Sequence, residues 1–310
     1  LNKPEIYSQY EAAQLKIKKA GDRSFIEYFA ELTKKRKANN RANWRSALKY
    51  LIDFTDGQLK FSDLNQRFLE DFKEYLLSTK SLKSDKTILA QNSAVSYFNK
   101  VKAALKQAYK DDLLQVDLNA KVSPIKSAET RREFLTIEEL NQLVLTPCNN
   151  ELMKRSALFS ALTGLRFSDI QKMTWGELEH IKDQGYILNY SQKKTSGVEV
   201  LPISDQAYGL TKGAADPADM PSKEAVFKGL KYSAYHNKHL YQWLGAAGIT
   251  KDITFHCFRH TFATLQLFNG TDIYTVSKML GHKDLKTTQV YAKIVDSAKR
   301  AASEKIKLDL

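Results

Sequence analysis

The hydrophobic pattern of the chain changes its period in one place, residues 185–203, and is helical over most of the rest. Residues 185–190 and 198–203 read as two strands, and the polar stretch from Lys193 to Gly197 reads as the turn that joins them. Helical spacing resumes near residue 234. One hairpin among many helices predicts a fold that is mainly α with a small antiparallel sheet.

The N-terminal part, residues 1–117, predicts a helical bundle. Apolar residues recur at helical spacing in four stretches, around residues 25–32, 44–52, 69–76 and 95–105. Ser62 and Asp63 are candidate caps for the third of these helices. Four amphipathic helices joined by short polar segments are typical of a small bundle.

A boundary is expected at residues 118–133, where the chain is polar, contains Pro124 and shows little periodicity. A second domain is then predicted over residues 134–310. It opens with Thr136 and Glu139, which are spaced as a capping box at the start of a helix.

The net charge of +13 indicates a polyanionic partner. The surplus of basic residues is divided almost equally between residues 1–120 and 121–310, as expected of a protein that encircles its partner. Solvated helix faces give a similar pattern, so the basic residues of the first domain are only candidates for contact with this polyanion. These candidates are Lys34, Arg36, Arg41, Arg45, Lys100 and Lys102.

Two cysteines without a CxxC motif argue against a disulfide framework and against a cysteine-based zinc site. No apolar run approaches the ~20 residues that span a bilayer, and no signal peptide is visible. We therefore expect a cytoplasmic protein without a membrane partner. The first residue is Leu1 rather than methionine, so further sequence is expected upstream.

Arg166 follows a Thr-Gly-Leu turn, and Asp169 lies three residues on, where it can orient the guanidinium. A surface ion pair is the alternative. In the run from Thr254 to Thr264, a helix would place His256, Arg259 and His260 on one face. Two histidines at this spacing also suit zinc, but an adjacent arginine repels a metal and instead suits phosphate oxygens.

His260 is the candidate for a hydrogen-bonded packing residue on that helix. Asp272 is placed to cap the next helix and Gly281 to end it, which leaves His282 just past its end. Nine residues later Tyr291 begins another helical pattern. Taken alone, a tyrosine at such a position is usually a core residue.

Together these motifs resemble the tyrosine recombinase (phage integrase) family: an arginine after TGL, a hairpin lysine, HxxR, LGH and a tyrosine nine residues on. The resemblance covers about residues 130–300, and the preceding helices are similar to the family's core-binding domain. The N-terminal half most resembles integrases of Bacteroides-type mobile elements. Some integrases carry an additional arm-binding domain upstream.

The resemblance implies a role for each matching residue. Arg166 and Arg259 would hold the scissile phosphate, His282 would hydrogen-bond to it, and His256 would move a proton near the nucleophile. Tyr291 would attack phosphorus, with Asp169 and His260 in support. The family pattern points to Lys194 as the hairpin lysine that would protonate the leaving oxygen, with the adjacent Lys193 as the alternative. Lys193 is also a further DNA-contact candidate.

The acid–base chemistry of these side chains agrees with the roles that the resemblance gives them. A phenol of pKa near ~10 is only about 0.1% ionised at pH 7 and needs a positive field or a base. The covalent phosphotyrosine conserves the bond energy, so no cofactor and no metal are expected. The resemblance also implies double-stranded DNA as partner, a homotetramer on paired sites and accessory DNA-bending proteins. A C-terminal helix at residues 297–310 would pack on a neighbouring protomer, and packing within its own chain is the alternative.

Three other functions remain open from the sequence. A type IB topoisomerase shares the chemistry but passes no strand to a partner duplex. A DNA-binding protein with an inactive site is a second alternative, and a metal-dependent hydrolase built on His256 and His260 is a third.

Overall fold

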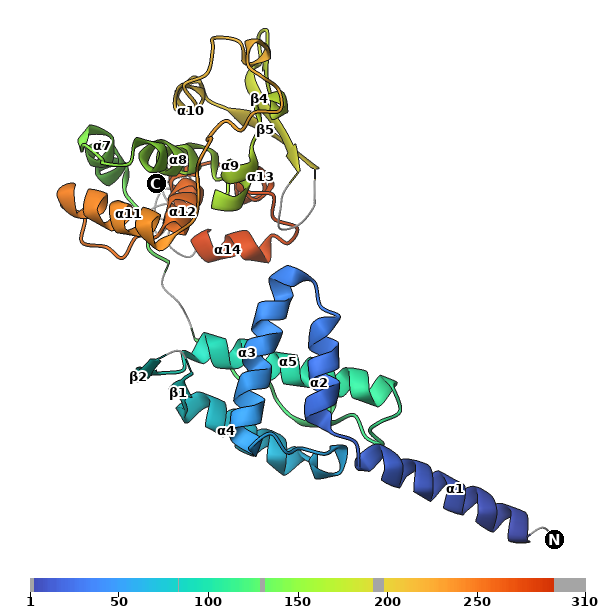
Figure 1. Ribbon diagram of the computed structural model, residues 1–310. Helices are drawn as coiled ribbons and strands as arrows, with labels where there is room; N and C mark the ends of the chain where they lie inside the picture. Colours follow the sequence, from blue (N-terminus) through green and yellow to red (C-terminus); the bar gives the residue numbers. More distant parts are fainter. Residues whose placement is uncertain (1–2, 83, 129–131, 192–197, 293–310) are drawn as a thin grey trace, which may run out of the picture. The chain divides into compact units, whose positions relative to one another are not determined.

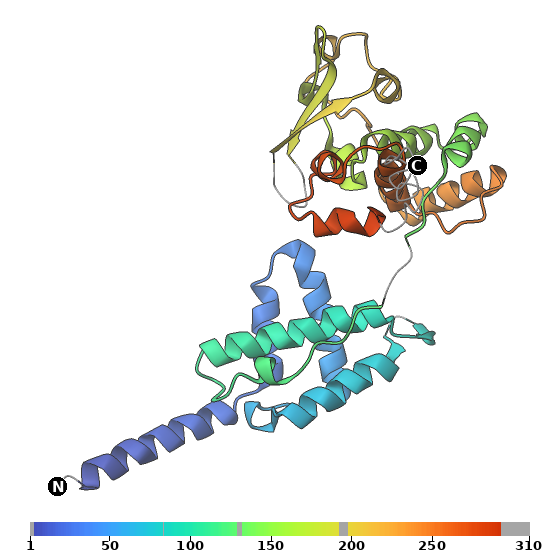
Figure 2. The same ribbon diagram turned by 180° about the vertical axis from the view of Figure 1, so that it is seen from behind.

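The computed structural model describes residues 3–82, 84–128, 132–191 and 198–292. It divides into two compact units, residues 1–130 and 131–310 (Figures 1 and 2). Helices dominate both units and small antiparallel sheets complete them, so the predicted fold class is confirmed. None of the helices in the described ranges is long and apolar enough to span a membrane.

The first unit is formed mainly by helices. Its elements are α1 (Lys3–Gly21), α2 (Phe25–Lys34), α3 (Ala38–Thr55), a 3-10 turn η1 (Phe61–Asp63), α4 (Gln66–Ser78), β1 (Lys80–Ser81), β2 (Ser84–Ile88), α5 (Gln91–Lys110) and α6 (Leu118–Lys121).

Helices α2, α3, α4 and α5 share one core, as their apolar stripes predict. Phe25 and Phe29 of α2 are fully buried, and the Phe29 ring lies 5.0 Å from the Trp44 ring of α3. Phe72 of α4 and Phe98 of α5 complete this aromatic core. Each such side chain contributes about 1.5–3 kcal/mol by leaving water, so this unit has a core large enough to hold its helices together.

Three features of this unit differ from the sequence prediction. A hairpin of β1 and β2 stands where only helices were expected, because these short polar strands carry no apolar period. Helix α4 is capped by Asn65, whose side chain accepts from the Phe68 amide at 2.9 Å, and not by Ser62 or Asp63. Part of the segment predicted as a linker packs into the core of the first unit, through Leu118, Val122 and Ile125.

The second unit holds more elements. In chain order they are α7 (Ile137–Leu145), α8 (Glu151–Thr163), α9 (Phe167–Lys172), η2 (Trp175–Glu177), β3 (Leu178–Ile181), β4 (Gly185–Ser191), β5 (Val198–Ile203), α10 (Asp205–Gly209), η3 (Pro217–Asp219), α11 (Ala234–Ala246), α12 (Phe255–Phe268), α13 (Ile273–Met279) and α14 (Lys286–Ala292).

The sheet of this unit is antiparallel in the order β3-β4-β5. Strands β4 and β5 are the predicted hairpin and pair from Tyr186 with Ile203 to Ser191 with Val198. Strand β3 was not predicted from the sequence. The turn that carries Lys193 and Lys194 lies outside the described residues.

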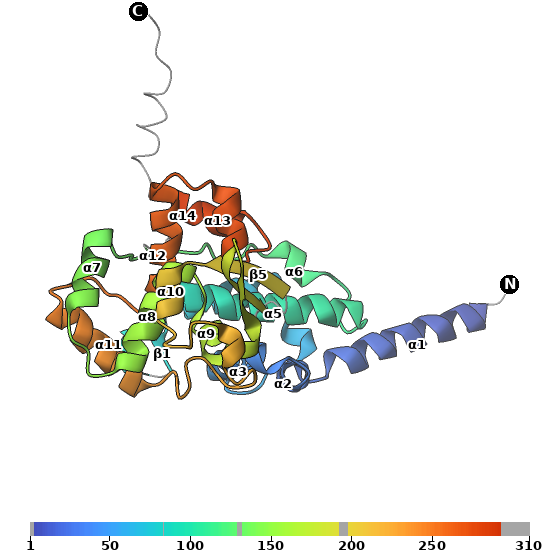
Figure 3. The same ribbon diagram turned by 90° about the horizontal axis from the view of Figure 1, so that it is seen from above.

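The helices of this unit meet around α12, which packs against α8 and contacts α13 and α14 (Figures 1 and 3). The capping box of Thr136 and Glu139 is present at α7, and Asp272 caps α13. Gly164 ends α8 with φ +70°, where a side chain would be strained. A Cβ there would lie 2.5 Å from the Phe262 ring and 2.9 Å from Leu280. Only glycine lets α8, α12 and α13 approach so closely.

Candidate active site

Arg166 lies where the sequence places it, at the N-cap of α9 directly after the Gly164 turn. Its Nη1 is 3.8 Å from Oδ2 of Asp169, whose side chain is fully buried. The predicted ion pair is therefore formed, and Asp169 helps to hold the guanidinium at the start of the helix.

Arg259 is the centre of the site and is only 2% exposed. Its Nη1 donates to the Gly164 carbonyl at 2.6 Å, and its Nη2 donates to the Leu280 carbonyl at 2.7 Å. Burial, together with the nearby charge of Arg166, lowers the pKa of Arg259 to about 10, so it stays charged at neutral pH. Its orientation is thus fixed by the ends of two other helices.

His282 lies just past α13 and bridges Arg259 to α14. Its Nε2 is 3.0 Å from Arg259 Nη2, and its Nδ1 is 2.8 Å from the hydroxyl oxygen of Thr288. Burial and the Arg259 charge lower the pKa of His282 to about 4, so the ring is neutral at pH 7. Because Arg259 can only donate, the neutral ring accepts at Nε2 and donates from Nδ1 to Thr288.

Tyr291 lies on α14 and is 2% exposed, with Phe262 and Leu280 in the same core cluster. Its hydroxyl oxygen is 2.7 Å from Nδ1 of His260 and accepts from Nη1 of Arg132 at 3.3 Å. Burial raises the pKa of the Tyr291 phenol, while the charges of Arg132 and Arg259 oppose that rise. The phenol is therefore protonated at neutral pH.

The two histidines of α12 lie in different environments. His256 is exposed, and its ring centroid is 4.5 Å from that of His260. His260 is buried, and it hydrogen-bonds to the candidate nucleophile rather than serving only to pack the helix. Burial and the neighbouring His256 lower the pKa of His260 to about 3, so its ring is neutral.

Arg132 was not predicted as a site residue, and neither was Thr288. Arg132 stands in the segment read as a linker, 159 positions from Tyr291, and nothing in the local sequence signals the contact. Thr288 could have been found from its place one helical turn before Tyr291, on the same face of an amphipathic pattern.

The metal alternative finds little support among these side chains. Nδ1 of His260 is engaged by Tyr291. Within the described ranges, no group of three or more His, Cys, Asp or Glu side chains is arranged to hold a metal ion.

The candidate DNA contacts of the first unit fall into two groups. Lys34 and Arg45 are exposed, and Arg36 is half-buried with its guanidinium 4.3 Å from the Trp44 ring centroid. Arg41 is also half-buried, and its Nε donates to the Arg36 carbonyl at 3.2 Å. All four residues lie on α2, on α3 or in the turn between these helices.

The lysines of α5 are less accessible than the pattern suggested. Lys100 is half-buried. Lys102 donates to the carbonyls of Asn119 and Val122, and burial lowers its pKa. The ammonium group of Lys102 thus holds the α6 segment on α5 and is not a free cation for DNA.

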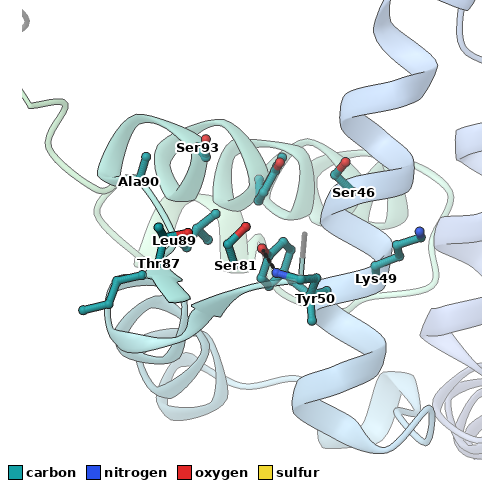
Figure 4. A pocket seen from close by; sticks show the side chains of 11 residues that line it. Ser46, Lys49, Tyr50, Ser81, Thr87, Leu89, Ala90 and Ser93 are labelled. Atoms are coloured by element: carbon teal, nitrogen blue, oxygen red, sulfur yellow. Dashed lines mark hydrogen bonds between the residues drawn. The ribbon is translucent and has the colours of Figure 1, made fainter. Parts of the chain in front are cut away.

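A hollow of about 370 Å³ also lies in the first unit, between α3, the β1–β2 hairpin and the start of α5 (Figure 4). Lys49, Ser46 and Ser93 contribute polar groups, and the Tyr50 hydroxyl accepts from the Leu82 amide at 2.9 Å. Of the catalytic candidates that the structure describes, none lines it.

Comparison with protein families finds two matches along the chain. Residues 133–297 match the phage integrase family, and residues 24–122 match the phage integrase SAM-like domain. The first match covers more than half of the chain.

Comparison with curated proteins finds tyrosine recombinases. The tyrosine recombinase XerD of Lacticaseibacillus casei is 26% identical over 78% of this chain and 85% of its own length. The XerD of Oceanobacillus iheyensis is 31% identical, over 52% of this chain and 58% of its own length.

Solved structures with a similar fold include the Tn1549 transposon integrase in complex with a circular intermediate DNA. It has a TM-score of 0.65 and 16% identity, and the match covers 92% of this chain and 99% of that one. A lambda integrase dimer bound to a core site has a TM-score of 0.64 and 18% identity, covering 90% and 80%. At these identities the likeness is one of fold.

Proposed function

The chain belongs to the phage integrase family of tyrosine recombinases, and from that premise we propose that it is a site-specific DNA recombinase. It cleaves and rejoins DNA strands through a covalent 3′-phosphotyrosine intermediate. One observation carries the proposal: Arg259 contacts both the turn before Arg166 and His282, in the same unit that contains Tyr291. Two guanidinium groups and an imidazole in one place can bind the oxygens of a phosphodiester.

The reaction is a pair of transesterifications. Tyr291 gives its hydroxyl proton to His256 as its oxygen attacks phosphorus, the bond from phosphorus to the 5′ oxygen breaks, and the departing oxygen takes a proton from Lys194. A free 5′ hydroxyl of the partner strand then attacks the 3′-phosphotyrosyl ester and returns a proton to Lys194, and the released Tyr291 takes its proton back from His256. Both steps exchange one phosphate ester for another, so neither needs an external energy source.

Arg166, Arg259 and His282 hold the phosphate and stabilise the charge that builds on its oxygens. Arg259 Nη2 points at His282 Nε2. A phosphate that takes over this guanidinium leaves Nε2 without its donor and raises the pKa of the ring by its negative charge. His282 then becomes a donor to the same phosphate. His256, exposed on α12, exchanges a proton near the nucleophile.

The proposed partners are duplex DNA, three further copies of the chain and DNA-bending proteins. We assign residues 297–310 to docking on a neighbouring protomer. An apolar hollow of about 400 Å³ lined by Phe134, Ile137, Leu265 and Phe268 supplies a surface for it on the catalytic unit. Deleting residues 297–310 is expected to abolish tetramers on DNA in a gel-shift assay; unchanged assembly removes this assignment.

We further propose that the recombinase serves a mobile genetic element and acts in the cytoplasm on the nucleoid. The similar fold of the Tn1549 transposon integrase supports this choice. Sequencing of cellular DNA for excised circles, with and without the gene, tests it. An unchanged level of circles contradicts it.

The function itself is tested by incubating the protein with a nicked duplex carrying its recombination site, in the presence of EDTA. A covalent protein–DNA adduct that disappears in Tyr291→Phe is expected. An adduct that persists in that variant contradicts the nucleophile, and loss of the reaction in EDTA favours the metal-dependent alternative. Relaxation of a supercoiled plasmid without strand exchange would identify the topoisomerase alternative.

A further inference from the structure

The hydroxyl group of Tyr291 is enclosed by two side chains from distant parts of the second unit. His260 Nδ1 lies 2.7 Å from the phenol oxygen, and Arg132 Nη1 donates to it at 3.3 Å. The Arg132 guanidinium also lies 5.6 Å from the centroid of the Tyr291 ring. The phenol is thus held on its face by a cation and at its oxygen by two hydrogen bonds.

The hydrogen bonds run in one direction. Arg132 can only donate, so the phenol oxygen accepts from it. The buried His260 ring is neutral, and its Nδ1 can accept a hydrogen bond from the phenol hydroxyl. The hydroxyl of Tyr291 then has a partner both as donor and as acceptor, which makes its buried position stable.

This position does not suit attack on a phosphate. Reacting atoms must approach to about 3–3.5 Å, but Tyr291 is 2% exposed. Of the described residues, Arg132 and His260 are those hydrogen-bonded to its hydroxyl, whereas Arg259 is bonded to the Gly164 and Leu280 carbonyls. The nucleophile therefore has to leave these two partners before it reaches a phosphate held by Arg166 and Arg259.

Arg132 occupies a particular place in the chain. It lies two residues after Thr130, where the first unit ends. A change in the path of the connecting segment would therefore act directly on the side chain that holds the nucleophile.

We propose that Arg132 and His260 form a latch that holds Tyr291 in a buried resting position, and that displacement of the segment carrying Arg132 releases the hydroxyl for attack. Both are positioning residues, since they act on the nucleophile and not on the substrate. The latch rests on the function proposed above, because it controls the same tyrosine.

The resting position is tested without DNA. The full chain is labelled with 3-fluorotyrosine, and the fluorine signal of Tyr291 is identified among the 15 tyrosines by its loss in Tyr291→Phe. In Arg132→Ala this signal is expected to broaden several-fold more with a soluble paramagnetic reagent, and in Arg132→Lys by an intermediate amount. Arg67→Ala, which removes an exposed arginine of the first unit, is the matched control.

The consequence for reactivity is tested with a single nicked half-site, selected from random duplexes by its binding to this protein. Arg132→Ala is expected to form the covalent adduct three- to tenfold faster than the wild type, because one charged hydrogen bond no longer opposes release. Arg132→Lys is expected to restore most of the slower rate.

Two results overturn the latch. One is a Tyr291 signal whose exposure is unchanged in Arg132→Ala. The other is an exposed signal with slower cleavage, which would make Arg132 part of the chemistry. If the wild type forms no adduct at all, the proposed function fails, but the fluorine measurement still decides whether Arg132 holds Tyr291.

Discussion

Cationic side chains are found in both units, but they are held in opposite ways. In the first unit Lys34 and Arg45 lie exposed on α2 and α3. In the second unit Arg259 is 2% exposed, and two backbone carbonyls fix its guanidinium. An exposed cation attracts any nearby phosphate and is screened by salt, whereas a fixed, buried guanidinium suits one phosphate in one orientation.

This difference in exposure predicts that the cations of the first unit act on DNA affinity and those of the second unit on the rate of cleavage. Charges spread over the first unit should contribute to DNA binding in small, additive steps, and those of the catalytic unit should act mainly on the transition state. Substitutions in the two units test this division.

The largest effect is expected in the catalytic unit, for Arg259→Lys. The variant keeps the positive charge but loses the planar fork, so single-turnover cleavage should fall on the order of 10²–10³-fold. DNA affinity in a filter-binding assay should change by only a few-fold. A fall in cleavage that merely follows a fall in affinity contradicts the division.

The next effect is a loss of stability in acid that belongs to the second unit. In the folded state the pKa of His282 is about 4 and that of His260 about 3, both below the ordinary value of 6.5. When the pH falls below 6.5, these two histidines bind protons in the unfolded chain but stay neutral in the folded chain. The stabilisation is therefore complete above about pH 6.5 and is lost as the pH falls toward 4, by on the order of a few kcal/mol.

Thermal unfolding measured between pH 7 and pH 4 checks this. The variant His282→Gln, which binds no proton, should show a smaller decrease in melting temperature across that range. The exposed His180 supplies the control, since His180→Gln should leave the wild-type decrease intact. Equal decreases in all three proteins would contradict a buried, neutral His282.

The smallest effects are expected in the first unit, where two cations allow a matched comparison. Lys102→Ala leaves the Asn119 and Val122 carbonyls without their donor and should lower the free energy of unfolding by about 1–3 kcal/mol. Arg45→Ala should leave stability within about 0.5 kcal/mol. It should weaken DNA binding a few-fold and reduce the salt dependence by about one phosphate contact.

Urea unfolding and binding titrations at several salt concentrations separate the two variants. If Lys102→Ala changes the salt dependence and Arg45→Ala does not, our distinction between structural and DNA-facing lysines and arginines is wrong.

Sequence reasoning succeeded where the information is local. Helix α12 and the β4–β5 hairpin follow from their own periodicity, and the turn at Gly164 follows from a residue that tolerates positive φ. The roles of Lys194 and of the other catalytic candidates remain predictions from the family pattern.

Contacts between distant segments could not be predicted in the same way. Arg132 and Tyr291 are 159 positions apart, and no periodic pattern connects them. Lys102 looked like a surface cation because its burial depends on α6, a short helix with no apolar stripe. His260 was predicted to be a packing residue because its hydrogen-bond partner, Tyr291, lies on α14. The sequence does not show that α14 packs against α12.

Gly164 has a consequence for how this protein can change over time. Its missing side chain makes room for Phe262 and Leu280, and its carbonyl oxygen orients Arg259. A substitution there would move the walls of the core and the catalytic guanidinium together. A substitution at Gly164 would therefore affect the stability of the fold and the catalytic activity together. Variants that improve only one of these two properties have to be sought at other positions.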